Sequence, residues 1–167
     1  MGAAMAVQDG GSHSDNRARI RALRPDLFPQ QYCIQSRQAD LDTLRHISNY
    51  SVATILGEAR TRMIREFAPR DQRPEGVVFM VGQNATTFVR QSHYPHDCTV
   101  GCGLLSIGTS TFRIVQALFQ QGECKALGES VLVAVRSDRA TPIDGALHQR
   151  LASLLLPEHA VPRQLIG

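Results

Sequence analysis

The spacing of apolar residues divides the chain into a helical part and a strand-rich part. Between residues 52 and 67, apolar side chains recur every three or four positions, which predicts an amphipathic helix with one buried face. The residues of that face are Val52, Ile55, Leu56, Ala59, Met63 and Phe67. Ser48 or Asn49 suits the N-cap position, and Pro69 ends the helix.

From Glu75 onward the pattern changes to alternation or to continuous apolar runs, which predicts strands. The candidate strands are GVVFMVGQN, TTFVRQSHY, CTVGCGLLSIG, TSTFRIVQALFQQG and ECKALGESVLVAVR. No segment between them is long enough for a crossover helix, so we expect antiparallel pairing. A further strand, QYCIQSRQ, precedes the long helix, and DGALHQRLASLLL is predicted to form a short closing helix with Asp144 near its start.

This element order predicts an α+β fold with a single helix on one face of a curved antiparallel sheet. A length of 167 residues with 43% hydrophobic content is enough for one domain with a real core. We place that domain at residues 26–160 and a C-terminal tail at 161–167. Residues 1–25 are rich in Gly, Ser, Asp and Arg, which predicts a flexible arm, in which RARIRALR could form a short helix.

Composition excludes several classes of partner. The net charge of +3 is mild and aromatic residues are only 5% of the chain, so we expect no nucleic-acid binding. No run of about 20 apolar residues is present and the N-terminus lacks the pattern of a signal peptide, so neither a membrane segment nor secretion is expected. The four cysteines have no C-x-x-C spacing, which favours reduced thiols in a cytoplasmic protein.

Candidate chemistry lies just before the long helix, in DLDTLRHISNYSVATILGEAR, residues 40–60. A helix N-terminus has free N–H groups and a partial positive charge, so amides near Asn49 and Tyr50 could stabilise an oxyanion formed from a thioester carbonyl. Asp42 could attack that carbonyl or take a proton from water, and His46 could orient the acid, hold a water or protonate the leaving thiolate. The same residues also suit ordinary helix capping, and the loop alone does not decide between these readings.

The same stretch resembles the signature of hot-dog-fold thioesterases of the hydroxybenzoyl-CoA thioesterase and acyl-ACP thioesterase group, D-x-D-x-x-G-H-V-N-N followed by a helix ending E-A-R. The matching residues are Asp40, Asp42, His46, Asn49, Glu58, Ala59 and Arg60, with Ile47 in place of Val. The resemblance extends over about residues 31–155. It implies a hot-dog fold, in which five to six antiparallel strands wrap a long central helix.

The resemblance also implies roles for residues and partners. Asp42 would be the nucleophile or general base, His46 would assist, and the amides near Asn49 and Tyr50 would polarise the thioester. The substrate would be an acyl-CoA or acyl-ACP, and no cofactor is expected. Two chains would pair through their sheets and share each active site, which requires a homodimer or a dimer of dimers.

The chain departs from the family signature at several positions. Arg45 replaces the usual Gly of the signature, and Ser48 replaces the first Asn of its N-N pair. The Arg45 side chain could narrow the pocket or reach a carrier phosphate. Leu44 stands where the plant acyl-ACP branch has Asn. The turn containing Thr109 and Ser110 offers N–H and hydroxyl donors, but no charge, where the hydroxybenzoyl-CoA enzyme has basic residues. CoA and carrier protein therefore both stay open, and a protein that binds acyl thioesters or scaffolds an assembly without hydrolysis is the alternative function.

Other polar residues have more ordinary interpretations. Glu58 could be a helix-borne base, but an ion pair with Arg62 at i+4 is favoured. His93 and His96 flank Pro95 in a turn where histidines are usually solvated, so we expect no metal site. Arg90, Arg113 and the N-terminal arginines could contact phosphates of a carrier, although each alone suits plain surface charge.

Overall fold

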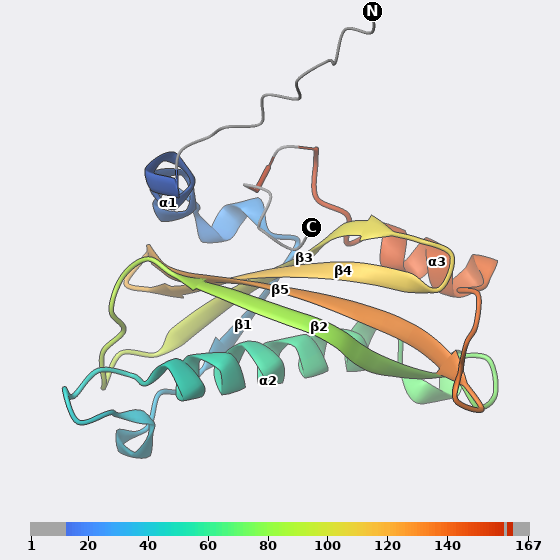
Figure 1. Cartoon of the computed structure of the whole chain (residues 1–167), viewed down its shortest axis with the longest axis horizontal. Coiled ribbons are helices and arrows are strands. Elements are labelled where there is room, and N and C mark those ends of the chain that lie inside the picture. The colour runs from blue at the N-terminus through green and yellow to red at the C-terminus, as the bar shows by residue number, and fades with distance from the viewer. Residues whose placement is uncertain (1–12, 159, 162–167) are drawn as a thin grey trace, which may run out of the picture.

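The computed structural model describes residues 13–158, 160 and 161, and it confirms the α+β hot-dog fold. The long helix α2 (Asn49–Phe67) lies along one face of a curved antiparallel sheet (Figure 1). Its strands follow the order β1-β3-β4-β5-β2, and the short β6 pairs with β5. The strand bounds are β1 Gln30–Ile34, β2 Val78–Phe88, β3 Cys98–Ile107, β4 Thr111–Gln120, β5 Glu123–Arg136 and β6 Arg139–Ala140.

The main core lies between α2 and the sheet, as the periodicity predicted. Ala59 and Met63 on the inner face of α2 are 0% and 1% exposed. The helix comes so close to the sheet that a Cβ on Gly128 of β5 would lie 2.8 Å from Leu56 Cδ1. A larger residue at 128 would therefore require the Leu56 side chain to shift.

The segment predicted as two strands, 76–84 and 86–94, is instead one strand, β2, that ends at Phe88. A β-bulge between Val81 and Gln83 absorbs the break in alternation that the sequence shows around Gly82. Residues 89–97 leave the sheet and lie beside the loop before α2, where Ser92 O accepts a hydrogen bond from Ile47 N at 2.8 Å. The second predicted strand therefore lies partly in β2 and partly in the segment that packs beside the loop before α2.

The second face of the sheet is also covered, which corrects the prediction of helix on one face only. The helix α1 (His13–Arg21) lies on the side of the sheet opposite α2 (Figure 1). Ile20 and Leu23 are 0% and 5% exposed and belong to a second apolar cluster with Phe28 and Phe119. Residues 13–25 therefore differ from the expected flexible arm, whereas residues 1–12 lie outside the described part of the chain.

The C-terminal part closes the core. Helix α3 (Gly145–Ala152) begins where predicted, because Asp144 is its N-cap and accepts a hydrogen bond from Leu147 N at 2.6 Å. Of the predicted tail, Val161 is described and buried, and residues 162–167 lie outside the described residues. The 3-10 turns are Pro25–Leu27, Gln38–Asp40 and Arg70–Gln72.

The described cysteines are free thiols. Cys98, Cys102 and Cys124 are buried and Cys33 is exposed. Burial raises the pKa of Cys98 to about 11 and those of Cys102 and Cys124 to about 12, so these three stay protonated at neutral pH. None of the described helices is both long and apolar enough to cross a membrane.

Candidate active site

The loop before α2 is a tight hairpin that closes on itself. Leu41 and Ile47 form an antiparallel bridge, and Asp42 N donates to His46 O at 2.8 Å. Arg45 N donates to Asp42 O at 3.0 Å, and Arg45 has a φ of 62°, in the left-handed region that favours glycine. The position at which Arg45 replaces the glycine of the family signature is thus the one with a positive φ in this loop.

Asp40 ties the loop to Arg37 and to the start of α2 through hydrogen bonds. Its side chain is 5% exposed and accepts hydrogen bonds from Arg37 N at 2.8 Å and from the Arg37 guanidinium at 2.9 Å. Its backbone oxygen accepts from Ser48 N, at the start of α2. Burial acts to raise the pKa of Asp40, but the hydrogen bonds from Arg37 outweigh it and the pKa is lowered, so the carboxylate is ionised at neutral pH.

The Asp42 side chain is held by the backbone of its own loop. Its Oδ1 accepts hydrogen bonds from Leu44 N at 2.8 Å and from His46 N at 3.0 Å. Within the described residues no group donates to Oδ2, so that oxygen is available to a substrate or a water. The side chain is exposed and lines a pocket, which leaves the carboxylate both oriented and accessible.

The tip of α2 next to Asp42 has free backbone donors. Ser48 is the N-cap, and its hydroxyl accepts from Ser51 N at 3.0 Å, so Asn49 is the first helical residue rather than the cap. The N–H groups of Asn49 and Tyr50 have no acceptor among the described residues. Free donors at a helix start favour an oxygen with developing negative charge.

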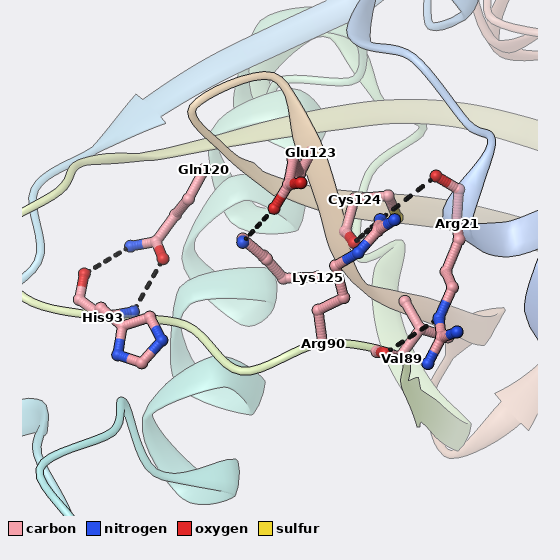
Figure 2. A network of polar contacts seen from close by, with 8 residues as sticks. All are labelled: Arg21, Val89, Arg90, His93, Gln120, Glu123, Cys124 and Lys125. Atoms are coloured by element: carbon pink, nitrogen blue, oxygen red, sulfur yellow. Dashed lines mark hydrogen bonds and ion pairs between the residues drawn. The ribbon is translucent and has the colours of Figure 1, made fainter.

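The two histidines near the loop pack against each other. The rings of His46 and His93 are 5.0 Å apart, edge to face, and the His46 imidazole makes no hydrogen bond to Asp42 among the described residues. Buried Gln120 holds the His93 segment: its Oε1 accepts from His93 N at 2.8 Å, and its Nε2 donates to His93 O at 2.9 Å (Figure 2). The same Nε2 also donates to His96 O at 2.7 Å. Gln120 therefore positions the ring that packs on His46.

These groups surround an open pocket of about 360 Å³ between the loop, the tip of α2 and the segment after β2. Its lining is Arg17, Asp42, His46, Ile47, Asn49, Val52, Phe88, Val89, Arg90, Gln91, Ser92, Lys125 and Ala126. A volume of this size suits part of an acyl thioester, and an acid, a histidine and apolar side chains share its wall. The pocket can therefore hold a carbonyl near both a carboxylate and free amides.

The structure brings some of the predicted site residues together and not others. Asp42, His46 and Asn49 line the pocket, whereas Arg45 does not, and Tyr50 is 82% exposed beside it. Thr109 and Ser110 come just before β4, and the first residue of β4 pairs with Val133 of β5. Val133 is eight residues along β5 from Lys125, which lines the pocket. That separation is roughly 25 Å, so within one chain the turn lies at the other end of the sheet.

Sequence analysis did not place Gln120 and Lys125 at the site, and it considered Arg17 only among the N-terminal arginines that could contact a carrier phosphate. Arg17 lies in the segment expected to be flexible, and Gln120 and Lys125 lie at strand ends within otherwise apolar runs. A polar residue buried in an apolar strand is the signal that could have identified the last two, because such groups need a specific partner. Glu58, in contrast, forms the predicted ion pair with Arg62.

No metal cluster is visible at the histidines. Among the described residues, no group of three or more His, Cys, Asp or Glu side chains could hold a metal ion. His93 and His96 are both exposed, and backbone groups of both contact Gln120.

Comparison with known proteins identifies the class to which this fold and site belong. The sequence profile of the thioesterase-like superfamily matches residues 36–151, which include the loop, α2 and the whole sheet from β2 onward. The chain therefore belongs to the thioesterase-like superfamily, and it is a thioester hydrolase. Among curated proteins, no sequence match was found.

Solved structures with the same fold are similar to this chain. A protein from Pseudomonas aeruginosa has 23% identity and a TM-score of 0.72 over 80% of this chain and 96% of its own. A thioesterase from Thermus thermophilus, solved with coenzyme A and zinc, has 25% identity and a TM-score of 0.68 over 76% and 94%. A predicted thioesterase from Bacillus stearothermophilus has 26% identity and a TM-score of 0.67 over 75% and 95%.

Proposed function

We propose that the protein hydrolyses an acyl-CoA or acyl-ACP thioester with Asp42 as the nucleophile or general base. The observation that carries this proposal is the Asp42 carboxylate, which is fixed through Oδ1 in the lining of a pocket that Asn49, at the start of α2, also lines. The thioester carbonyl would accept from the N–H groups of Asn49 and Tyr50 while the carboxylate acts on its carbon or on a water. A similar protein solved with coenzyme A supports a CoA thioester as substrate.

The reaction can follow either of two routes that consume one water and give the same products. As a general base, Asp42 takes a proton from water as the hydroxyl oxygen bonds to the carbonyl carbon. As a nucleophile, Asp42 forms a mixed anhydride that water then cleaves. In both routes the C–S bond breaks, the thiolate leaves and is protonated, and the products are a carboxylate and a free thiol. We assign the proton transfer to sulfur to His46, which is half-buried and is the histidine in the described lining of the pocket.

Replacement of Asp42 by asparagine tests this role. An Asn side-chain oxygen can still accept from Leu44 N and His46 N, so Asp42→Asn should keep the loop while it removes the charge. We expect kcat for thiol release to fall by about 10² to 10⁴ with an unchanged melting temperature. The measurement is a colorimetric thiol assay over a panel of aliphatic and aromatic acyl-CoAs.

Two controls make the outcome of that assay specific. Asp26→Asn removes an exposed carboxylate outside the pocket lining and should leave turnover unchanged. Wild-type turnover in Asp42→Asn would remove Asp42 from the mechanism. Binding of acyl-CoAs by the wild type without thiol release from any of them would instead favour the non-hydrolytic function.

The site is proposed to be completed by a second chain. In the described part of the chain, β2 is an edge strand, paired only with β5, and Met80 and Val81 on it are 55% and 45% exposed. An edge strand with exposed apolar side chains favours pairing with another strand. Two chains joined along β2 would form a continuous sheet, and a partner could bring the turn with Thr109 and Ser110 toward the carrier.

A further inference from the structure

Basic side chains are prominent in the lining of the pocket. Three lining residues, Arg17, Arg90 and Lys125, are basic, whereas Asp42 is the one carboxylate in the described lining. Arg17 comes from α1 and Arg90 from the segment after β2, and Lys125 lies near the start of β5. The lining therefore carries more positive than negative charge, and α1, the segment after β2 and β5 all contribute to it.

Helix α1 is fastened to this wall by reciprocal hydrogen bonds (Figure 2). The Arg21 guanidinium donates to Val89 O, at 3.2 Å from Nε and 3.1 Å from Nη2. In return, Arg90 Nη1 donates to Arg21 O and to Cys124 O, each at 3.3 Å. Arg17 precedes Arg21 by four residues, so both side chains leave the same face of the helix. This attachment explains why Arg17 lies at the pocket although its helix is outside the sheet.

Lys125 and Arg17 have hydrogen-bond donors that are available to a ligand. Lys125 is 7% exposed, and its Nζ donates to Glu123 Oε2 at 2.8 Å (Figure 2). An ammonium group has three donors, so two remain after this bond. Arg17 makes no hydrogen bond or ion pair with any described residue. Because a lysine is rarely buried without strong pairing, its place in the pocket wall needs an explanation beyond surface charge.

We propose that Arg17, Arg90 and Lys125 form a clamp for the phosphate groups of the thioester carrier. The proposal rests on thioester hydrolysis at Asp42 and names the part of the substrate that lies away from the acyl group. Helix α1 lies outside residues 36–151, the segment that matches the superfamily. Phosphate esters suit these donors, because guanidinium and ammonium groups form strong charge-assisted hydrogen bonds with phosphate oxygens.

The phosphate could come from two sources. In an acyl-CoA it is the diphosphate and the 3′-phosphate of the nucleotide, and in an acyl carrier protein it is the phosphodiester that joins phosphopantetheine to the protein. An acyl-pantetheine has the same thioester and no phosphate. Comparison of these three carriers, each with the same hexanoyl group, separates phosphate recognition from recognition of the acyl group.

The decisive variant is Arg17→Gln, with Arg19→Gln as its matched control. Arg19 is on the same helix but is exposed and outside the pocket. We expect Arg17→Gln to raise KM for hexanoyl-CoA about tenfold, with kcat within about twofold, because one charge-assisted contact is lost in ground state and transition state alike. KM for hexanoyl-pantetheine should stay at the wild-type value, and Arg19→Gln should match wild type on every carrier.

Different outcomes identify the source or overturn the clamp. A loss confined to hexanoyl-CoA assigns the clamp to the nucleotide phosphates, and an equal loss with the acyl carrier protein assigns it to the shared phosphodiester. An equal rise of KM for hexanoyl-pantetheine, or equal behaviour of Arg17→Gln and Arg19→Gln, overturns the proposal. Lys125→Gln should repeat the pattern of Arg17→Gln.

Binding of free CoA keeps this test independent of hydrolysis. By titration calorimetry, wild type should bind CoA more weakly as salt rises, because exposed charges are screened. Arg17→Gln should bind about tenfold more weakly at low salt. Failure of wild type to cleave any thioester of the aliphatic and aromatic panel would refute the proposed function but leave the clamp standing if CoA still binds in this way. Equal CoA binding by wild type and Arg17→Gln would overturn the clamp even in an active enzyme.

Discussion

Arg45 occupies a backbone conformation that costs an L-residue free energy. Its φ of 62° closes the hairpin that presents Asp42, and a left-handed conformation disfavours a non-glycine residue by roughly 1–2 kcal/mol. The side chain does not line the pocket, so no contact in the described site offsets that cost. The loop geometry is therefore maintained by the hydrogen bonds of Asp42 rather than by the preference of residue 45.

Replacement of Arg45 by glycine should stabilise the protein. We expect Arg45→Gly to raise the free energy of unfolding by about 0.5–1 kcal/mol, because relief of strain exceeds the added entropy of the unfolded chain. Arg45→Ala keeps the Cβ and should give no such gain. Urea denaturation measures both, as a shift in midpoint at constant slope. An equal gain in the two variants would show that the charge of Arg45, not its backbone, is unfavourable.

Most of α2 and its loop could be predicted from the sequence because their signals are local. The apolar period of α2 and the capping residue Ser48 are adjacent in the chain and need no distant partner. The extent of β2 was predicted wrongly, since a bulge at Gly82 looks in sequence like the end of a strand. The position of α1 was missed because Ile20 and Leu23 become buried only against a sheet surface made by residues about 90 positions later.

The anchor at Asp40 makes the loop sensitive to acid. The pKa of Asp40 is lower in the folded state than in the unfolded chain, where it is about 3.9. As pH falls, the unfolded chain therefore binds a proton at Asp40 before the folded protein does. The stability that Asp40 contributes is therefore present above about pH 4 and is lost as pH falls through the lower, folded-state pKa.

The comparison of wild type with Asp40→Asn tests this dependence. At pH 7, Asp40→Asn should be less stable by about 1–2 kcal/mol, because the Arg37 guanidinium loses its charged acceptor. The difference should shrink as pH falls from 5 toward 2, as followed by urea denaturation at each pH. Asp26→Asn, at an exposed carboxylate, should follow wild type throughout. A difference that is constant with pH would contradict the role of the ionised carboxylate.

At the scale of the whole molecule, the candidate site lies at the end of the edge strand β2, and residues beside it are exposed. The pocket lies where β2 ends, and one chain leaves Tyr50 82% exposed and Leu44 71% exposed beside it. Such exposure around a substrate pocket is expected where a second subunit covers it. The sequence indicates the pairing only through resemblance, since one chain cannot orient the side chains of another.

A dimer formed along β2 should be necessary for activity. Wild type is expected to show twice the 18.4 kDa of one chain, or four times in a dimer of dimers, by light scattering at micromolar concentration. Val81→Asp places a charge on the exposed edge and should shift the mass to that of a monomer and reduce thiol release, because the pocket loses its second wall. Leu27→Asp, at an exposed apolar residue away from β2, should change neither mass nor turnover. A wild-type monomer with full activity would show that one chain is sufficient and that the exposed residues of β2 serve another purpose.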